Sequence, residues 1–77
     1  METTTARLLS QVDEGQTVGI VGIKGGRGLR SRLTAMGLLP KTQIMVVRNG
    51  KSGPFVIIVK NSRMAIGRGV ADKIMVL

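Results

Sequence analysis

The sequence predicts a mostly β fold, a small and partly open barrel of about five strands with one short α-helix. The chain has 77 residues, which suffices for one small domain. Valine and isoleucine together outnumber leucine sixteen to seven, a ratio that favours strands over helices. Eleven glycines and two prolines further indicate that the strands are short and joined by tight turns.

The N-terminal residues predict a short tail followed by the domain. Residues 1–7 are polar and threonine-rich, so we expect a flexible tail at 1–7 and the domain at 8–77. Leu9 and Val12 are spaced i, i+3 and precede Gly15, which permits a positive φ. This pattern predicts one turn of helix or a tight loop that places both side chains under the barrel.

Five segments have strand character. Thr17–Ile23 is β-branched on both faces, which predicts a buried strand, and its two glycines indicate a bulge or a close backbone approach. Asn-Gly and Gly-Pro dipeptides within residues 49–54 are turn signals that predict a hairpin between the flanking strands. The predicted strands are Thr17–Ile23, Thr42–Arg48, Phe55–Lys60, Arg63–Ile66 and Lys73–Val76, with a tight connection at Asn61–Ser62 and a turn over residues 67–72.

One helix is predicted between the first two of these strands. Leu29, Leu33 and Met36 fall at i, i+4 and i+7 and therefore share one helical face. Gly37 is suited to end the helix in a left-handed conformation, and Pro40 bars its continuation. About five short strands and one helix are typical of a barrel of the SH3 or OB type.

Composition excludes most catalytic chemistry. The chain has no cysteine and no histidine, so it lacks thiolate and imidazole metal ligands, cysteine nucleophiles and histidine bases. Four acids are too few to predict a cage of oxygen ligands around a hard cation; they are Glu2, Asp13, Glu14 and Asp72. We therefore expect no catalytic residues, no cofactor and no resident metal.

The net charge predicts an anionic partner. Twelve Lys and Arg residues against four acids give +8, a balance that attracts nucleic acid, anionic lipid or an acidic protein face. Small barrels that bind nucleic acid stack bases on aromatic side chains, and Phe55 is the one aromatic residue of the sequence, which argues against nucleic acid. The sequence shows neither a leader pattern nor an apolar run of about 18 residues, so we expect a cytoplasmic protein.

Residues 24–32 form a glycine-rich turn that runs into the predicted helix. Backbone amides in such a turn, together with the helix dipole, can bind a phosphate or a carboxylate. The stretch lacks the spacing of the phosphate-binding glycine motifs, so a plain connection with solvated arginines is the simpler interpretation.

Two apolar sets have alternative interpretations. The strands that contain Ile44–Val47 and Phe55–Val59 are apolar on both faces. Their outer sides are covered either by the apolar face of the helix together with Val76–Leu77, or by a partner or a second copy. An uncovered edge strand could also be extended by a partner. Methionine adapts to irregular gaps, so four methionines are predicted to fill the core: Met36, Met45, Met64 and Met75.

The most specific motif is Gly26-x-Gly28-Leu29-Arg30-x-Arg32-Leu33-x-x-Met36-Gly37-Leu38-x-Pro40. Weaker pieces flank it: Leu9-Ser10-x-Val12-x-x-Gly15, Gly53-Pro54, Met64-Ala65-Ile66 and Ala71-x-x-Ile74-x-Val76. Together they resemble the FeoA-type domain of bacterial ferrous-iron transport. That family is itself similar to the C-terminal SH3-like domain of iron-dependent repressors. The resemblance spans about residues 8–77 and implies an SH3-like barrel.

Two positions depart from the family pattern. Lys41 stands where the family commonly has glycine after the proline. A type II turn would strain a lysine there because it needs a positive φ, so we expect type I geometry. Val70 stands where an acidic residue is common, so we expect the salt bridge of that acid to be absent.

The resemblance implies a cytoplasmic accessory to a membrane ferrous-iron transporter with a G domain (FeoB-type), which acts by protein contact and without catalysis. Anionic lipid beside the transporter is a further expected contact, at the inner face of the membrane. The alternatives are a basic nucleic-acid-binding barrel, whose affinity would fall steeply with salt, and a weakly self-associating structural adaptor. The predicted docking surface consists of Lys24, Arg27, Arg30, Arg32, Leu38 and Leu39.

Overall fold

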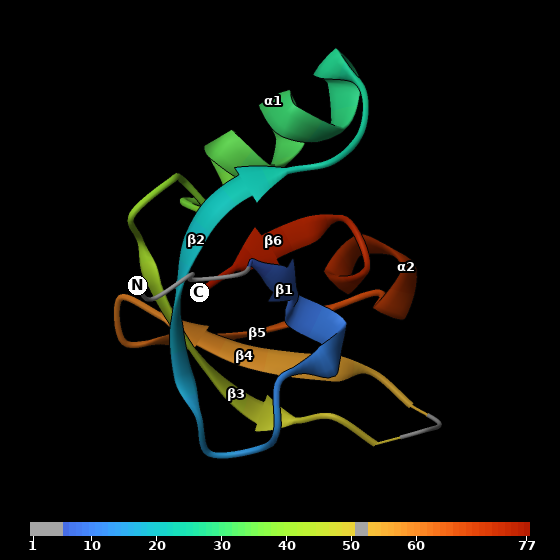
Figure 1. Cartoon of the computed structure of the whole chain (residues 1–77). Coiled ribbons are helices and arrows are strands. Elements are labelled where there is room, and N and C mark those ends of the chain that lie inside the picture. Colours follow the sequence, from blue (N-terminus) through green and yellow to red (C-terminus); the bar gives the residue numbers. More distant parts are fainter. Residues whose placement is uncertain (1–5, 51–52) are drawn as a thin grey trace, which may run out of the picture.

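The computed structural model describes residues 6–50 and 53–77, and six strands form one antiparallel sheet there (Figure 1). The strands are β1 (Arg7–Leu8), β2 (Thr17–Ile23), β3 (Gln43–Arg48), β4 (Phe55–Val59), β5 (Ser62–Ile66) and β6 (Ile74–Val76). Their order in the sheet is β1-β6-β2-β3-β4-β5. Because β1 and β5 end the sheet without pairing to each other, the predicted partly open, mostly β barrel is confirmed.

Three helical segments connect the strands: η1 (Leu9–Gln11, a 3-10 turn), α1 (Arg27–Ala35) and α2 (Arg68–Ala71). The helix predicted between the first two long strands is confirmed as α1. The sequence predicted a turn at the position of the four-residue α2, because glycine has a low helix propensity. The amides of Val70 and Ala71 donate to the carbonyl of Gly67 at 3.0 Å and close this helical turn.

The N-terminal segment packs as the spacing of its apolar residues predicts. Leu9 and Val12 are fully buried, and η1 begins at Leu9. Arg7, which the sequence assigns to the tail, lies in β1 and pairs with Val76. Residues 1–5 of the predicted tail lie outside the described residues.

Strand β2 has the predicted bounds, and its register shifts between Ile20 and Gly22, which confirms the predicted bulge. The prediction that both faces are buried is wrong. Ile20 points into the core, whereas Val21 is 44% exposed, because an open sheet leaves its outer face to solvent. The β4–β5 turn lies one residue earlier than predicted, at Lys60 and Asn61, whose φ angles of 51° and 67° are those of a type I′ turn.

Helix α1 ends in a Schellman motif. Gly37 has a φ of 88°, its amide donates to the carbonyl of Thr34 at 3.0 Å, and the amide of Leu38 donates to the carbonyl of Leu33 at 2.9 Å. In this motif the residue after the glycine packs against the residue five positions earlier, and both Leu33 and Leu38 are buried. The predicted helix end at Gly37 is confirmed.

The turn that follows corrects the expectation of type I geometry. Lys41 has a φ of 75°, and the amide of Thr42 donates to the carbonyl of Leu39 at 3.0 Å, as in a type II turn. The amide of Lys41 donates to the carbonyl of Ile20 at 2.7 Å, and the amide of Ile20 donates to Thr42 at 2.9 Å. These bonds to β2 fix the turn and hold the lysine in the left-handed region.

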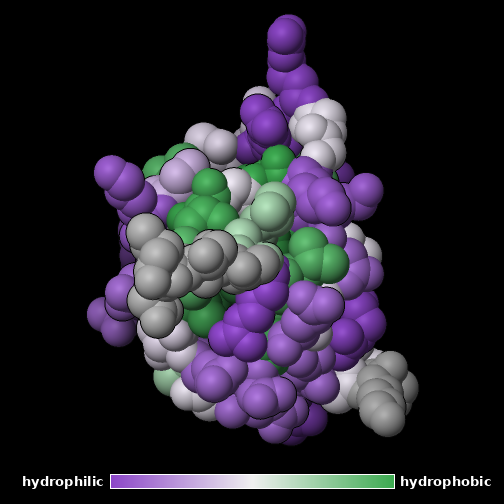
Figure 2. Space-filling model, in the orientation of Figure 1, coloured by the Kyte–Doolittle hydropathy of each residue, from purple (hydrophilic) through white to green (hydrophobic). Residues whose placement is uncertain are grey.

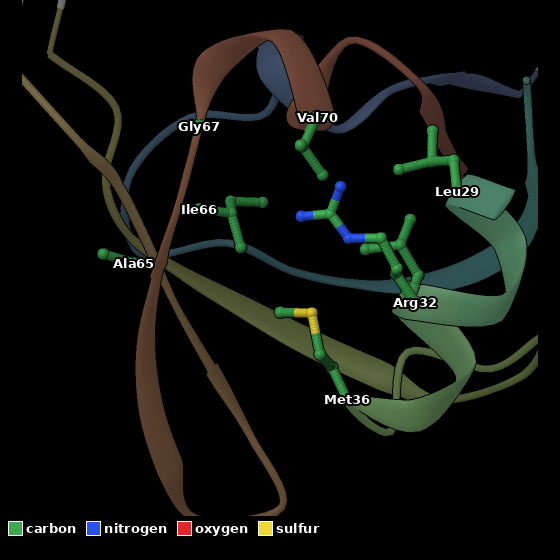
Figure 3. A pocket seen from close by; sticks show the side chains of 8 residues that line it. Leu29, Arg32, Met36, Ala65, Ile66, Gly67 and Val70 are labelled. Atoms are coloured by element: carbon green, nitrogen blue, oxygen red, sulfur yellow. The ribbon is translucent and has the colours of Figure 1, made fainter.

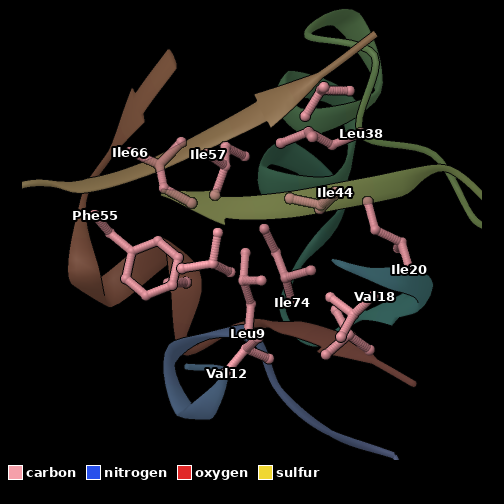
Figure 4. Packing of buried hydrophobic residues seen from close by; sticks show 14 of the residues in the cluster. Leu9, Val12, Val18, Ile20, Leu38, Ile44, Phe55, Ile57, Ile66 and Ile74 are labelled. Carbon is pink, nitrogen blue, oxygen red and sulfur yellow. The ribbon is translucent and has the colours of Figure 1, made fainter. Parts of the chain in front are cut away.

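The core lies inside the curved sheet and is built from valine, isoleucine, leucine, one phenylalanine and one alanine (Figure 4). The prediction that the methionines fill it is wrong for Met36 and Met45, which are 41% and 37% exposed. Leu33 and Val76, expected to cover the outer faces of the strands, are themselves part of the core. The outer face of β3 and β4 therefore stays partly open to solvent at Met45.

Candidate functional site

Helix α1 projects from one end of the sheet (Figure 1), and the face of this end shown in Figure 2 is largely hydrophilic. Leu33 is its one fully buried residue. The side chains of Arg27, Arg30 and Arg32 are exposed. The helix begins after Gly26, with no side-chain cap and no acid in its first turn. Its basic side chains are therefore open to a partner.

A groove of about 160 Å³ separates α1 from β5 and α2 (Figure 3). Apart from the guanidinium of Arg32 and the backbone of the glycine, the side chains that line it are apolar. The lining residues are Leu29, Arg32, Leu33, Met36, Ala65, Ile66, Gly67 and Val70. The groove therefore combines an apolar lining with one permanent positive charge.

A second hollow, of about 390 Å³, lies between α1 and β2. Arg30 lines it from the helix, opposite apolar residues of β2 and the turn that precedes β3. The complete lining is Val21, Gly22, Ile23, Arg30, Thr34 and Pro40. Both sides of α1 thus present an arginine next to apolar surface.

The structure divides the predicted basic surface between these two sides. Residues two positions apart on a helix differ by about 200° in direction, so Arg30 and Arg32 face opposite ways. They line different hollows accordingly. Lys24 is exposed just after β2, where its amide donates to the carbonyl of Lys73 at 2.6 Å. The predicted cations are brought around one helix but not onto one face.

One predicted docking residue is wrong. Leu38 has no exposed surface because the Schellman motif turns it into the core, so it cannot contact a partner. Its neighbour Leu39 is 37% exposed and remains available. The apolar part of the predicted surface is therefore reduced to Leu39.

Sequence reasoning missed the wall of the groove formed by Ala65, Ile66, Gly67 and Val70. The shared helical face of Leu29, Leu33 and Met36 was a usable signal, since it shows which side of the helix meets the fold. Its counterpart could not be assigned because α2 was taken for a turn.

Two acids among the described residues accept hydrogen bonds that hold parts of the domain together. Glu14 accepts a hydrogen bond from the amide of Asn49 at 2.8 Å, and Asp72 accepts one from the hydroxyl of Ser10. Within residues 6–50 and 53–77, no three acidic side chains group in a way that could hold a metal ion. No helix in those residues is both long enough and apolar enough to span a membrane.

Comparison with known proteins gives a consistent result. Residues 7–77 match the model of the FeoA domain. The chain is 43% identical over 68 residues to a protein of Methanocaldococcus jannaschii provisionally named Fe(2+) transport protein A, covering 88% of this chain and 82% of that protein. A crystal structure of an iron uptake regulatory protein (FeoA) is 38% identical, with a TM-score of 0.86, and the match covers 94% of this chain and 96% of that one.

More distant structures show the fold alone. Stenotrophomonas maltophilia FeoA, crystallised with zinc and described as a prokaryotic SH3 domain protein, is 19% identical with a TM-score of 0.80 over 94% of this chain and 91% of that one. A manganese-dependent transcriptional repressor is 18% identical with a TM-score of 0.86, over 99% of this chain and 43% of the repressor. The predicted SH3-like fold and its likeness to part of such repressors are therefore confirmed.

Proposed function

This chain belongs to the FeoA domain family of Fe(2+) transport, and we propose that it is a non-catalytic accessory of a membrane ferrous-iron transporter with a G domain. It docks on the cytosolic portion of that transporter through α1. The observation that carries the proposal is the exposure of Arg27, Arg30 and Arg32 on a projecting helix that has an apolar hollow on each side.

The donor groups of the chain support a role in contact and not in holding iron. Fe²⁺ in proteins is bound mainly by imidazole, thiolate and carboxylate groups, and the sequence contains neither histidine nor cysteine. Glu14 and Asp72 accept hydrogen bonds that tie loops of the domain together. Iron is therefore the cargo of the transporter and not a ligand of this chain.

Charge and apolar surface have separate roles in this docking. Exposed arginines raise the rate of encounter with an acidic face and make that rate sensitive to salt. The half-exposed apolar groups beside them, Met36 and Leu39, supply contact area that is insensitive to salt. Accessory contacts of this size commonly have weak affinities, so we expect micromolar binding.

A double charge reversal tests the proposal. Arg27→Glu with Arg30→Glu should weaken binding to the purified cytosolic portion of the transporter at least tenfold and reduce its salt dependence. The matched control is Arg7→Glu with Arg48→Glu, which changes the net charge equally at exposed positions of β1 and β3. The control should bind within about twofold of the parent chain at physiological salt, where charges away from the contact are screened.

Equal affinity of the parent chain and the α1 double variant would overturn docking through α1. Tight binding to duplex DNA or to anionic vesicles, with none to the transporter portion, would replace the proposal by one of the two other anionic partners. A molecular mass in light scattering that rises with concentration would instead indicate self-association.

A further inference from the structure

The sheet has a free edge beside the α1 groove. Among residues 6–50 and 53–77, strand β5 pairs with β4 alone, and Val59 opposes Ser62 across the two-residue turn. Residues that flank a two-residue turn exchange both hydrogen bonds, and opposed pairs then alternate along the ladder. Met64 and Ile66 therefore bond to β4, while the amide and carbonyl of Ala65 face away from it.

Ala65 also lines the groove, and its side chain points away from the other lining side chains (Figure 3). The backbone of the free edge therefore borders the apolar hollow. A cavity of about 150 Å³ lined by apolar side chains accepts a ligand the size of benzene. The groove, at about 160 Å³, therefore has room for one large apolar side chain. A strand added to β5 would direct alternate side chains to this side of the sheet.

The guanidinium of Arg32 extends over the groove toward Ile66 and Val70 (Figure 3). No acid pairs with it among residues 6–50 and 53–77. The segments on either side are purely basic: residues 27–36 carry Arg27, Arg30 and Arg32, and residues 60–70 carry Lys60, Arg63 and Arg68, with no acid in either. The groove thus offers a site for a carboxylate at Arg32, between two segments that carry basic residues and no acid.

These charges select the occupant. A second copy of the chain would bring the same basic segments and a net charge of +8 against this edge, and like charges across strands are destabilising. Arg63 lies on the edge strand, a placement that natural proteins use against self-pairing. An acidic segment would instead be attracted to this edge.

We propose that the groove between α1 and β5 binds an extended acidic peptide segment of the transporter, which adds a strand to β5 at Ala65. One apolar side chain of the segment fills the groove, and a neighbouring carboxylate binds Arg32. This inference rests on the proposed function for its partner and adds the binding mode and the chemistry of the bound segment.

Two variants remove the two halves of the site. Ala65→Pro removes the free edge amide, and proline is tolerated on an edge strand where the amide faces solvent, so the fold should persist. Ala65→Ser keeps the amide and is its control. Arg32→Glu reverses the charge in the groove, and Arg48→Glu is its control because Arg48 is exposed on β3 and does not line the groove. Circular dichroism checks the fold, and Arg32→Glu, at an exposed side chain, remains usable if the proline variant unfolds.

The probe is a displayed library of random decapeptides selected on the parent chain. We expect the selected peptides to combine acidic residues with an apolar one. Their affinity should fall at least tenfold with Ala65→Pro and with Arg32→Glu, and stay within about twofold for both controls. In spectra of the ¹⁵N-labelled chain, the amides of Ala65 and Gly67 should shift on binding. Failure to enrich such peptides, or equal binding to both variants, would overturn the inference.

The same variants separate this inference from the proposed function. If the cytosolic portion of the transporter binds Ala65→Pro and Arg32→Glu as tightly as the parent, and binds the Arg27→Glu, Arg30→Glu double variant weakly, the groove mode is wrong and docking through α1 stands. If acidic peptides bind the groove and the transporter portion does not bind the parent chain, the proposed function is wrong.

Discussion

Arg68 and Asn49 meet across 19 residues of sequence, with Nη2 of the arginine donating to Oδ1 of the asparagine at 2.7 Å. The same guanidinium lies 5.7 Å from the ring centroid of Phe55. The amide Nδ2 of Asn49 in turn donates to the carbonyls of Ser10 and Val12, at 3.1 and 2.7 Å. One side chain therefore joins η1, the β3–β4 connection and α2.

Removing this junction should destabilise the whole domain. Asn49→Ala leaves the carbonyls of Ser10 and Val12 without a donor. It also removes one of the two acceptors of Arg68, the other being the carbonyl of Gly50. We therefore expect a loss of about 2 kcal/mol in the free energy of unfolding. Urea denaturation measures it. Gln43→Ala, at an exposed position of β3, is the control and should stay within about 0.5 kcal/mol. A similar small change for both variants would show that the junction contributes no stability.

Truncation of the two adjacent leucines after α1 should destabilise the fold by very different amounts. Leu38→Ala opens a cavity in the core, so it should lower the free energy of unfolding by about 3 kcal/mol. Leu39→Ala removes a partly exposed side chain and should cost less than about 1 kcal/mol. Thermal denaturation of both variants measures the two losses. Equal losses would contradict the burial of Leu38.

Replacing the strained lysine should stabilise the fold. Lys41 has a φ of 75°, where an L side chain is unfavourable by about 1 kcal/mol relative to glycine. Lys41→Gly should therefore raise the melting temperature by a few degrees, as about 1 kcal/mol does in a domain of this size. Lys73→Gly is the control; its φ is not in the left-handed region, so added chain entropy should leave it unchanged or less stable. A drop in stability for Lys41→Gly would show that the turn carries no strain.

Much of the fold follows from local patterns. The i, i+4, i+7 spacing of Leu29, Leu33 and Met36 with the following glycine placed α1, and the Asn-Gly and Gly-Pro signals placed the β3–β4 hairpin. The turn at Lys41 is type II and not the predicted type I, because its conformation is set by hydrogen bonds to Ile20. Turn preferences do not contain this tertiary constraint.

The candidate site was less predictable than the fold. The burial of Leu38 follows from the Schellman motif, in which it packs against Leu33, so this part was readable from the helix end. The separation of Arg30 from Arg32 follows from helical geometry alone. The groove could not be predicted, because α2 contains one glycine, is preceded by another at its N-cap, and forms only where the fold holds it against η1.

The shallow anchoring of α1 has a consequence for its motion. One fully buried side chain, Leu33, holds the helix, and residues with positive φ, Gly25 and Gly37, flank it. Segments with few buried contacts open at a lower free energy than the strands of the core. Amide hydrogens of α1 should therefore exchange with solvent before those of β3 and β4, as expected for a separate unit of low stability. A ligand bound in either hollow beside the helix should slow this exchange, so the exchange rate of α1 reports whether a hollow is occupied.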